Sequence, residues 1–225
     1  MPVSPNSATS AAATSERSAV LAMVTTMARM QAEHNAQVHP QWRSQGYPYY
    51  RAIWMECAEL IDHYGWKWWK HQQADLDQVR LELVDIWHFG LSDLLRNDVA
   101  LADIAQLFAG LGNPKGGTAD EFRDAVEAFA LRTGSDQAFS LDAFIAVLQL
   151  LPMTLTQTFE LYVGKNVLNH FRQDHGYKSG EYRKLWQGRE DNEHLIEALA
   201  QLACTPDEVP AELYAALAER YAASS

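Results

Sequence analysis

Two stretches decide the fold of this chain: RAIWMECAELIDHYGWKWWK, residues 51–70, and VRLELVDIWHFGLSDLL, residues 79–95. Each repeats apolar side chains at intervals of three and four residues, which is typical of a helix with one face against a core. The spacing between Glu59 and Glu82 fits one helix end, one tight turn and one helix start. The two stretches therefore predict an antiparallel helical hairpin.

Four carboxylates lie on this predicted hairpin in two pairs. Glu56 and Glu59 belong to the first stretch, and Glu82 and Asp85 to the second. Residues at i and i+3 share one face of a helix. The four acids have no Lys or Arg three or four residues away, and their faces are otherwise apolar. Because uncompensated charge is costly in apolar surroundings, the pattern predicts a site for divalent cations. Carboxylate oxygens suit Mg²⁺, and Mn²⁺ is possible.

Two other classes of protein remain open at this point. His88 lies three residues after Asp85, and His63 lies four after Glu59. An acid-x-x-His element is typical of di-iron carboxylate bundles, so a redox protein of that class is one alternative. A helical interaction module whose acids are merely solvated is the other.

Composition limits the function further. The chain has 225 residues, 48% of them hydrophobic, and a formal net charge of −11. An acidic balance argues against general nucleic-acid binding, which needs a basic surface. Cys57 and Cys204 show no metal-ligand spacing, and the sequence has neither an apolar run long enough for a membrane span nor a signal-peptide pattern. We therefore expect a cytoplasmic protein with free thiols and no membrane partner.

The rest of the chain also has a helical pattern, and no convincing strand pattern is found, so we expect an all-α fold. Residues 1–14 are mainly Ser, Ala, Thr and Pro with little to bury, and we interpret them as a disordered leader. Residues 15–225 form a single all-α catalytic domain in this interpretation, with a variable helical insertion at about 111–140. The expected helices cover about 15–38, 50–71, 76–97, 100–110, 119–132, 140–152, 154–175, 191–203 and 207–222.

A second polar pattern lies in the expected helix 154–175. Lys165, Asn169 and Arg172 occupy positions i, i+4 and i+7, which form one stripe. These side chains could clamp an anion, with Tyr177 and Lys184 arriving from the following loop. A solvated helix face explains the same pattern.

Gln31 and Asn35 continue the apolar stripe of the first expected helix. A carboxamide donates and accepts, which suits either a nucleobase edge or a buried polar network. Trp66, Trp68 and Trp69 are interpreted as core and interface residues rather than as a stacking platform.

The chain resembles a known family at several of these points. ECAELIDHYGWKWWK, ELVDIWHF and KNVLNHFRQDHGYKSGEYRKLWQGREDNEHL resemble the dimeric, all-α dUTP diphosphatases of the MazG-like nucleoside-triphosphate pyrophosphohydrolase superfamily. The resemblance spans about residues 24–197. It implies a helical bundle with a more mobile helical subdomain, a homodimer, and hydrolysis of dUTP, and commonly dUDP, to dUMP with release of pyrophosphate or phosphate. A related housekeeping enzyme acting on other or modified nucleotides is the nearest alternative.

The resemblance also implies roles for individual residues. The four acids would bind two or three Mg²⁺ ions, and Glu59 would help to orient the attacking water, with attack favoured at the β-phosphorus. The uracil and sugar would contact Gln31, Asn35, Trp66 and Phe89. The phosphates and sugar would be held by Lys165, Asn169, Arg172, Tyr177, Lys184, Asp191 and Asn192.

Overall fold

The computed structural model describes residues 5–204 and 208–224, with side chains from residue 15 onward. It confirms the all-α prediction, because the described part consists of nine α-helices, one short 3-10 helix and a two-stranded β-hairpin. The elements are α1 (Pro5–Val38), η1 (Trp42–Ser44), α2 (Tyr49–Tyr64), α3 (Leu76–Arg96), α4 (Leu101–Leu111), α5 (Ala119–Asp136), α6 (Leu141–Leu150), α7 (Leu155–Asp174), β1 (Leu185–Trp186), β2 (Arg189–Glu190), α8 (Asp191–Gln201) and α9 (Val209–Ala222).

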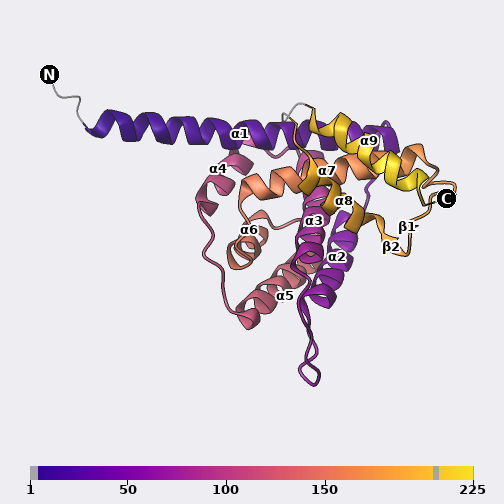
Figure 1. The fold of residues 1–225 in the computed structure, drawn as a ribbon. Helices are drawn as coiled ribbons and strands as arrows, with labels where there is room; N and C mark the ends of the chain where they lie inside the picture. The colour runs from indigo at the N-terminus through magenta and orange to yellow at the C-terminus, as the bar shows by residue number, and fades with distance from the viewer. Residues whose placement is uncertain (1–4, 205–207, 225) are drawn as a thin grey trace.

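The predicted hairpin is formed by α2 and α3, which lie side by side with the connecting segment at one end (Figure 1). Their contact surface belongs to the main core, to which α2 contributes Ile53, Cys57 and Leu60. The segment that connects the two helices leads back to α2 at Asp75, whose N–H donates to the carbonyl of His63 at 3.0 Å. The carboxylates of the two helices are therefore brought to the same part of the molecule.

The second helix is shorter than predicted. It ends at Tyr64 rather than near residue 71, and Gly65 follows with φ +93°. This backbone conformation favours glycine and stops the helix. Arg123 of α5 fixes the end, because its Nε donates to the Gly65 carbonyl at 2.7 Å. α3 begins with a side-chain cap, because the Asp75 side chain accepts from the N–H of Gln78 at 3.2 Å.

α1 is a long helix, and its N-terminal part extends beyond the other elements (Figure 1). It begins at Pro5, ten residues before the predicted start, so most of the stretch assigned to a leader is helical here. Residues 1–4 of that assignment lie outside the described residues. Val24 and Met27 of α1 are fully buried in the main core. The division into leader, catalytic domain and variable insertion stays a prediction.

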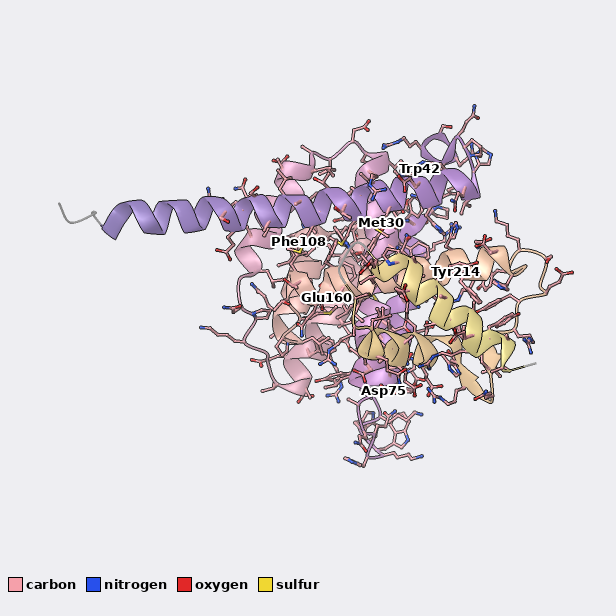
Figure 2. The ribbon with its side chains drawn as sticks, turned by 45° about the horizontal axis from the view of Figure 1, so that its top comes forward. Met30, Trp42, Asp75, Phe108, Glu160 and Tyr214 are labelled. Atoms are coloured by element: carbon pink, nitrogen blue, oxygen red, sulfur yellow. The ribbon has the colours of Figure 1, made fainter. Side chains whose placement is uncertain are left out.

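A second, smaller hydrophobic core contains residues of α7, α8 and α9. It is built around Phe171, Trp186, Leu195 and Leu213. Figure 2 labels Trp42 and Phe108 of the main core and Tyr214, which packs against the smaller one. A separate core fits a subdomain, and its mobility stays a prediction.

The β-hairpin was not predicted from the sequence. β1 and β2 pair antiparallel, with Trp186 opposite Arg189. Gln187 and Gly188 join them with φ +52° and +81°, as a tight two-residue hairpin turn requires. Two-residue strands are too short for the alternating pattern that identifies a strand.

Among the described helices, no single one combines the length and apolar character of a membrane span. Only the bent pair α6 and α7 meets those two criteria together.

Candidate active site: a carboxylate cluster on the helical hairpin

Three of the four predicted metal ligands meet between α2 and α3. Glu56, Glu59 and Glu82 each place one carboxylate oxygen within 4.8 Å of the others. Glu82 is buried, Glu56 is half-buried and Glu59 is exposed. The cluster therefore leads from the core to the surface, with Glu59 on the solvent side.

The electrostatics of this carboxylate cluster are unfavourable without a cation. Burial raises the pKa of Glu56 well above its ordinary value, and the negative charges of Asp85, Glu82 and Glu59 raise it further. Burial and Asp85 also raise the pKa of Glu82, although nearby Lys165 opposes this. A set of hard oxygen donors that repel one another fits a Mg²⁺ or Mn²⁺ ion.

The fourth acid, Asp85, has a different partner. Its Oδ2 lies 2.7 Å from Nζ of Lys165 on α7. The Lys165 side chain is only 2% exposed and also donates to Oδ1 of Asn192 at 2.9 Å. Asp85 lies close enough to raise the pKa of both Glu56 and Glu82. The predicted phosphate-binding lysine is thus in contact with the predicted metal site.

Arg172 lies at the centre of the remaining phosphate-side residues. Its Nε and one terminal nitrogen donate to the two Asp191 oxygens, both at 2.8 Å, and its other terminal nitrogen donates to Asn169 Oδ1 at 3.1 Å. The Tyr182 hydroxyl also donates to Asp191 Oδ2 at 2.8 Å. The sequence prediction missed Tyr182, whose only signal was its place in the aromatic loop before Asp191.

Tyr177 and Lys184 are less closely attached to this group. The Arg172 guanidinium carbon lies 6.0 Å from the centre of the Tyr177 ring, and Tyr177 is exposed. Lys184 is exposed and lies 3.5 Å from a carboxylate oxygen of Glu190. Both residues lie on the segment that leads into α8, as predicted.

Gln31 and Asn35 lie in a buried hydrogen-bond network. The Gln31 amide nitrogen donates to Asn35 Oδ1 at 3.1 Å and to Ser92 Oγ at 2.9 Å. Its carbonyl oxygen accepts from the Tyr162 hydroxyl at 2.7 Å and contacts His88 Nδ1 at 2.8 Å. Of the two roles that the sequence left open, the structure shows both amides in a buried polar network. Their contact with a nucleobase stays a prediction. Ser92, His88 and Tyr162 were missed as partners.

Trp66 and Phe89 lie in different surroundings. Phe89 is half-buried against the main core. Trp66 follows Gly65 in the segment between α2 and α3, is 45% exposed, and donates through its indole N–H to Asp62 at 2.9 Å. Trp68 and Trp69 are 90% and 56% exposed. The interpretation of these tryptophans as core residues is wrong, and an interface role stays a prediction.

The two histidines that suggested iron occupy separate places. His63 Nε2 lies 3.8 Å from Glu82 Oε1, while His88 contacts Gln31. Among the described residues, the one group with metal-ligand geometry consists of carboxylates alone.

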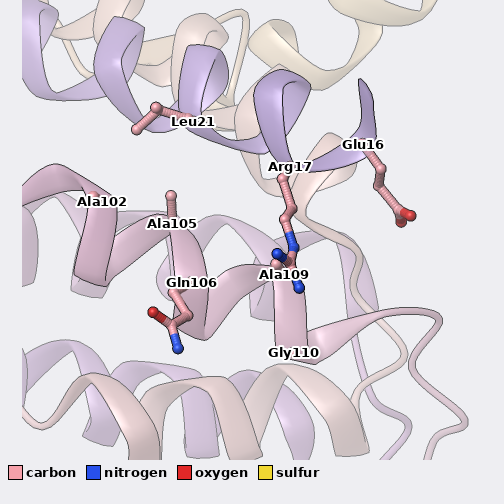
Figure 3. Close-up of a pocket in the computed structure, with 8 residues that line it drawn as sticks. All are labelled: Glu16, Arg17, Leu21, Ala102, Ala105, Gln106, Ala109 and Gly110. Carbon is pink, nitrogen blue, oxygen red and sulfur yellow. The ribbon is translucent and has the colours of Figure 1, made fainter. Parts of the chain in front are cut away.

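A groove of about 660 Å³ lies elsewhere, between the N-terminal half of α1 and α4 (Figure 3). Its lining includes Arg17, Leu21, Ala105 and Gln106, and it shares no residue with the carboxylate cluster.

Comparison with known proteins identifies the family of this chain. The family model described as dUTPase matches residues 23–177, a region that includes the four acids, Gln31, Asn35, Lys165 and Arg172. A search of curated proteins found no match. The matched region covers more than half of the chain, from α1 to the end of α7. The chain therefore belongs to the dUTPase family and is a dUTP diphosphatase.

Proposed function

We propose that this enzyme hydrolyses dUTP, and also dUDP, to dUMP with release of pyrophosphate or phosphate, at a Mg²⁺ site held by Glu56, Glu59, Glu82 and Asp85. The observation that supports this most directly is the gathering of three carboxylates within 4.8 Å on a helical hairpin. The catalytic domain in this proposal is the single all-α unit of residues 15–225. Two or three Mg²⁺ ions, or Mn²⁺, fit the number of carboxylates.

The acids and the bases have separate tasks in this mechanism. Bound Mg²⁺ would offset the charge of the phosphates and make a nearby water more acidic. Glu59 is the exposed member of the carboxylate cluster, and we assign to it the orientation of the attacking water and acceptance of its proton. Glu56, Glu82 and Asp85 would hold the metal from the more buried side of the cluster.

The phosphates would be held from α7 and α8. Lys165 and Arg172 each pair with a carboxylate of the protein, Asp85 and Asp191 respectively, which supports a role for both in binding an anionic group. Charge-assisted hydrogen bonds to phosphate would replace or extend these pairs. Asn169 accepts a hydrogen bond from Arg172, and Asn192 accepts one from Lys165. Tyr177 and Lys184 would close the site from the loop.

The base and sugar would lie toward α1, where Gln31 and Asn35 read the uracil edge, with Trp66 lining the pocket and Phe89 crowding the sugar. A second candidate is a related pyrophosphohydrolase with broader nucleotide specificity. It is favoured by one observation: Gln31 uses both its amide hydrogens and its carbonyl oxygen within the protein.

A substrate panel tests the proposal. We expect Mg²⁺-dependent release of pyrophosphate from dUTP, no turnover in excess chelator, and much slower turnover of dCTP, dTTP and UTP. Equal turnover of these nucleotides would favour the broader enzyme, and absence of dUTP hydrolysis with Mg²⁺ or Mn²⁺ would exclude the proposed function. In ¹⁸O-labelled water, label in pyrophosphate supports attack at the β-phosphorus, and label in dUMP contradicts it.

A homodimer belongs to the same proposal. Trp54 and Met55 on α2 are 58% and 50% exposed, close in sequence to the catalytic acids. Trp66, Trp68 and Trp69 are exposed as well, and exposed apolar side chains of this size are often covered by partners. Light scattering should give twice the mass of the chain, and Trp54→Lys should lower it. The free thiols of Cys57 and Cys204 support a reducing, cytoplasmic location.

A further inference from the structure

His88 carries a hydrogen-bonding atom that the fold leaves unused. The residue is only 6% exposed, and its Nε2 is buried without a hydrogen-bond partner among the described residues. Buried polar atoms almost always have a partner. Its other ring nitrogen, Nδ1, lies 2.8 Å from the Gln31 carbonyl oxygen. The unused atom therefore belongs to a residue that is otherwise held in place.

The surrounding network fixes which nitrogen carries the proton. Ser92 has one hydroxyl proton, which it donates to the His88 backbone carbonyl at 2.8 Å. Its oxygen must then accept from the Gln31 and Asn35 amide nitrogens, both at 2.9 Å. This turns the Gln31 carbonyl toward His88, so Nδ1 must donate.

Nε2 is consequently a bare acceptor. Burial lowers the pKa of His88 well below its ordinary value, and the charges of His34 and Lys165 lower it further. The ring is therefore neutral near pH 7, and no second proton is available to Nε2.

His88 lies on the same helix as two of the four acids, Glu82 and Asp85. Glu82, Asp85, His88 and Ser92 follow one another at spacings of three and four on α3, which places them along one face. His88 lies one turn beyond Asp85, roughly 5 Å along the helix axis. A nucleotide whose phosphates lie at the acids can therefore bring its base to this turn.

We propose that His88 Nε2 accepts a hydrogen bond from the N3–H of the substrate base and so selects uracil over cytosine. This rests on the proposed function. Uracil carries a proton on N3, whereas N3 of cytosine is itself an acceptor. Two acceptors would face each other in the cytosine complex, with a buried group left unpaired. The Gln31 carbonyl oxygen contacts Nδ1 of His88 at 2.8 Å, so Gln31 also orients the His88 ring in this proposal.

Two variants separate base reading from a structural role. His88→Asn keeps a hydrogen-bonding group near the position of Nδ1 but has none near Nε2. Tyr162→Phe removes a different partner of the Gln31 carbonyl, the hydroxyl at 2.7 Å, and leaves Nε2 intact. We expect His88→Asn to lower the ratio of kcat/KM for dUTP over dCTP by about ten-fold or more. Tyr162→Phe should lower the melting temperature but keep that ratio within about two-fold of the parent.

A folded His88→Asn enzyme with the parent ratio would overturn the inference, as would an equal change of ratio in Tyr162→Phe. The tautomer has its own readout, a long-range ¹H–¹⁵N spectrum of the histidine rings. We expect Nε2 of His88 to be unprotonated in the free protein and to shift when dUMP and Mg²⁺ are added. A protonated Nε2, or no shift with dUMP bound, would contradict the inference. The free-state spectrum needs no turnover, so failure of the proposed function is recognised separately, by the absence of dUTP hydrolysis.

Discussion

Nζ of Lys165 lies 2.7 Å from Oδ2 of Asp85, so a buried ammonium from α7 neutralises one of the four carboxylates predicted to bind metal. The residues come from helices far apart in the sequence. The lysine also opposes the rise in the pKa of Glu82 that burial and Asp85 cause. A cation that takes Asp85 as a ligand must therefore displace or share this ammonium.

Lys165→Met tests this competition. Without the ammonium, the acids present more negative charge to an incoming cation, so we expect Mn²⁺ to bind about ten-fold more tightly in the absence of nucleotide. Titration calorimetry or Mn²⁺ spin resonance at mildly alkaline pH measures this directly. Lys184→Met is the matched control, because it removes the same charge from an exposed position beside Glu190. Equal or weaker Mn²⁺ binding by Lys165→Met would show that the ammonium does not compete.

Glu59→Gln should lose about 10³-fold in kcat on dUTP, the scale expected for a residue that activates water. The helices should stay folded, because Glu59 is exposed and repels its neighbours. Turnover and the melting temperature are measured together. Asp77→Asn removes a carboxylate from the first turn of α3, outside the carboxylate cluster, and should change kcat less than about two-fold. Near-parental turnover by Glu59→Gln would remove this residue from the mechanism.

Asp191→Asn should destabilise the smaller core by about 3 kcal/mol, since it removes one partner of a buried ion pair and leaves Arg172 uncompensated. Urea unfolding gives the change in the free energy of unfolding. Glu197 makes two exposed ion pairs, with Arg189 and Arg220, so Glu197→Gln is the control and should shift the unfolding midpoint far less. Similar shifts in the two variants would mean that the buried pair adds no special stability.

The stability of the enzyme should depend on His34 below its ordinary pKa of 6.5. Burial lowers the pKa of His34 in the folded state, and the nearby charges of His170 and Lys178 lower it further. On acidification the unfolded chain takes up a proton that the folded chain resists, so this stability is lost as pH falls through the window below 6.5.

Urea unfolding of the parent and of His34→Gln at about pH 7.5 and about pH 5.5 measures this effect. The raised pKa values of Glu56 and Glu82 act in the opposite direction, but they are common to both proteins and cancel in the difference. We expect the parent to lose more stability than the variant on acidification. Parallel changes in the two proteins would contradict the role of His34.

Much of the site was readable from local spacing. The i, i+3 acids and the helical hairpin follow from positions that share one helix face, and three of the four carboxylates meet as predicted. Local spacing does not show that Gly65 takes a positive φ. It therefore did not predict that α2 ends at Tyr64 or that the tryptophans after it are exposed. The β1–β2 hairpin was missed because its strands have two residues each.

The sequence by itself determined the all-α class, the positions of the main helices and the identity of the acids, because helix periodicity and residue chemistry are local properties. Only the tertiary structure decided that Lys165 is paired with Asp85, that Arg172 is paired with Asp191, and that Gln31 contacts His88. Each of these contacts joins different elements. Their geometry depends on how whole helices pack against a shared core, and no spacing within a single helix specifies that packing.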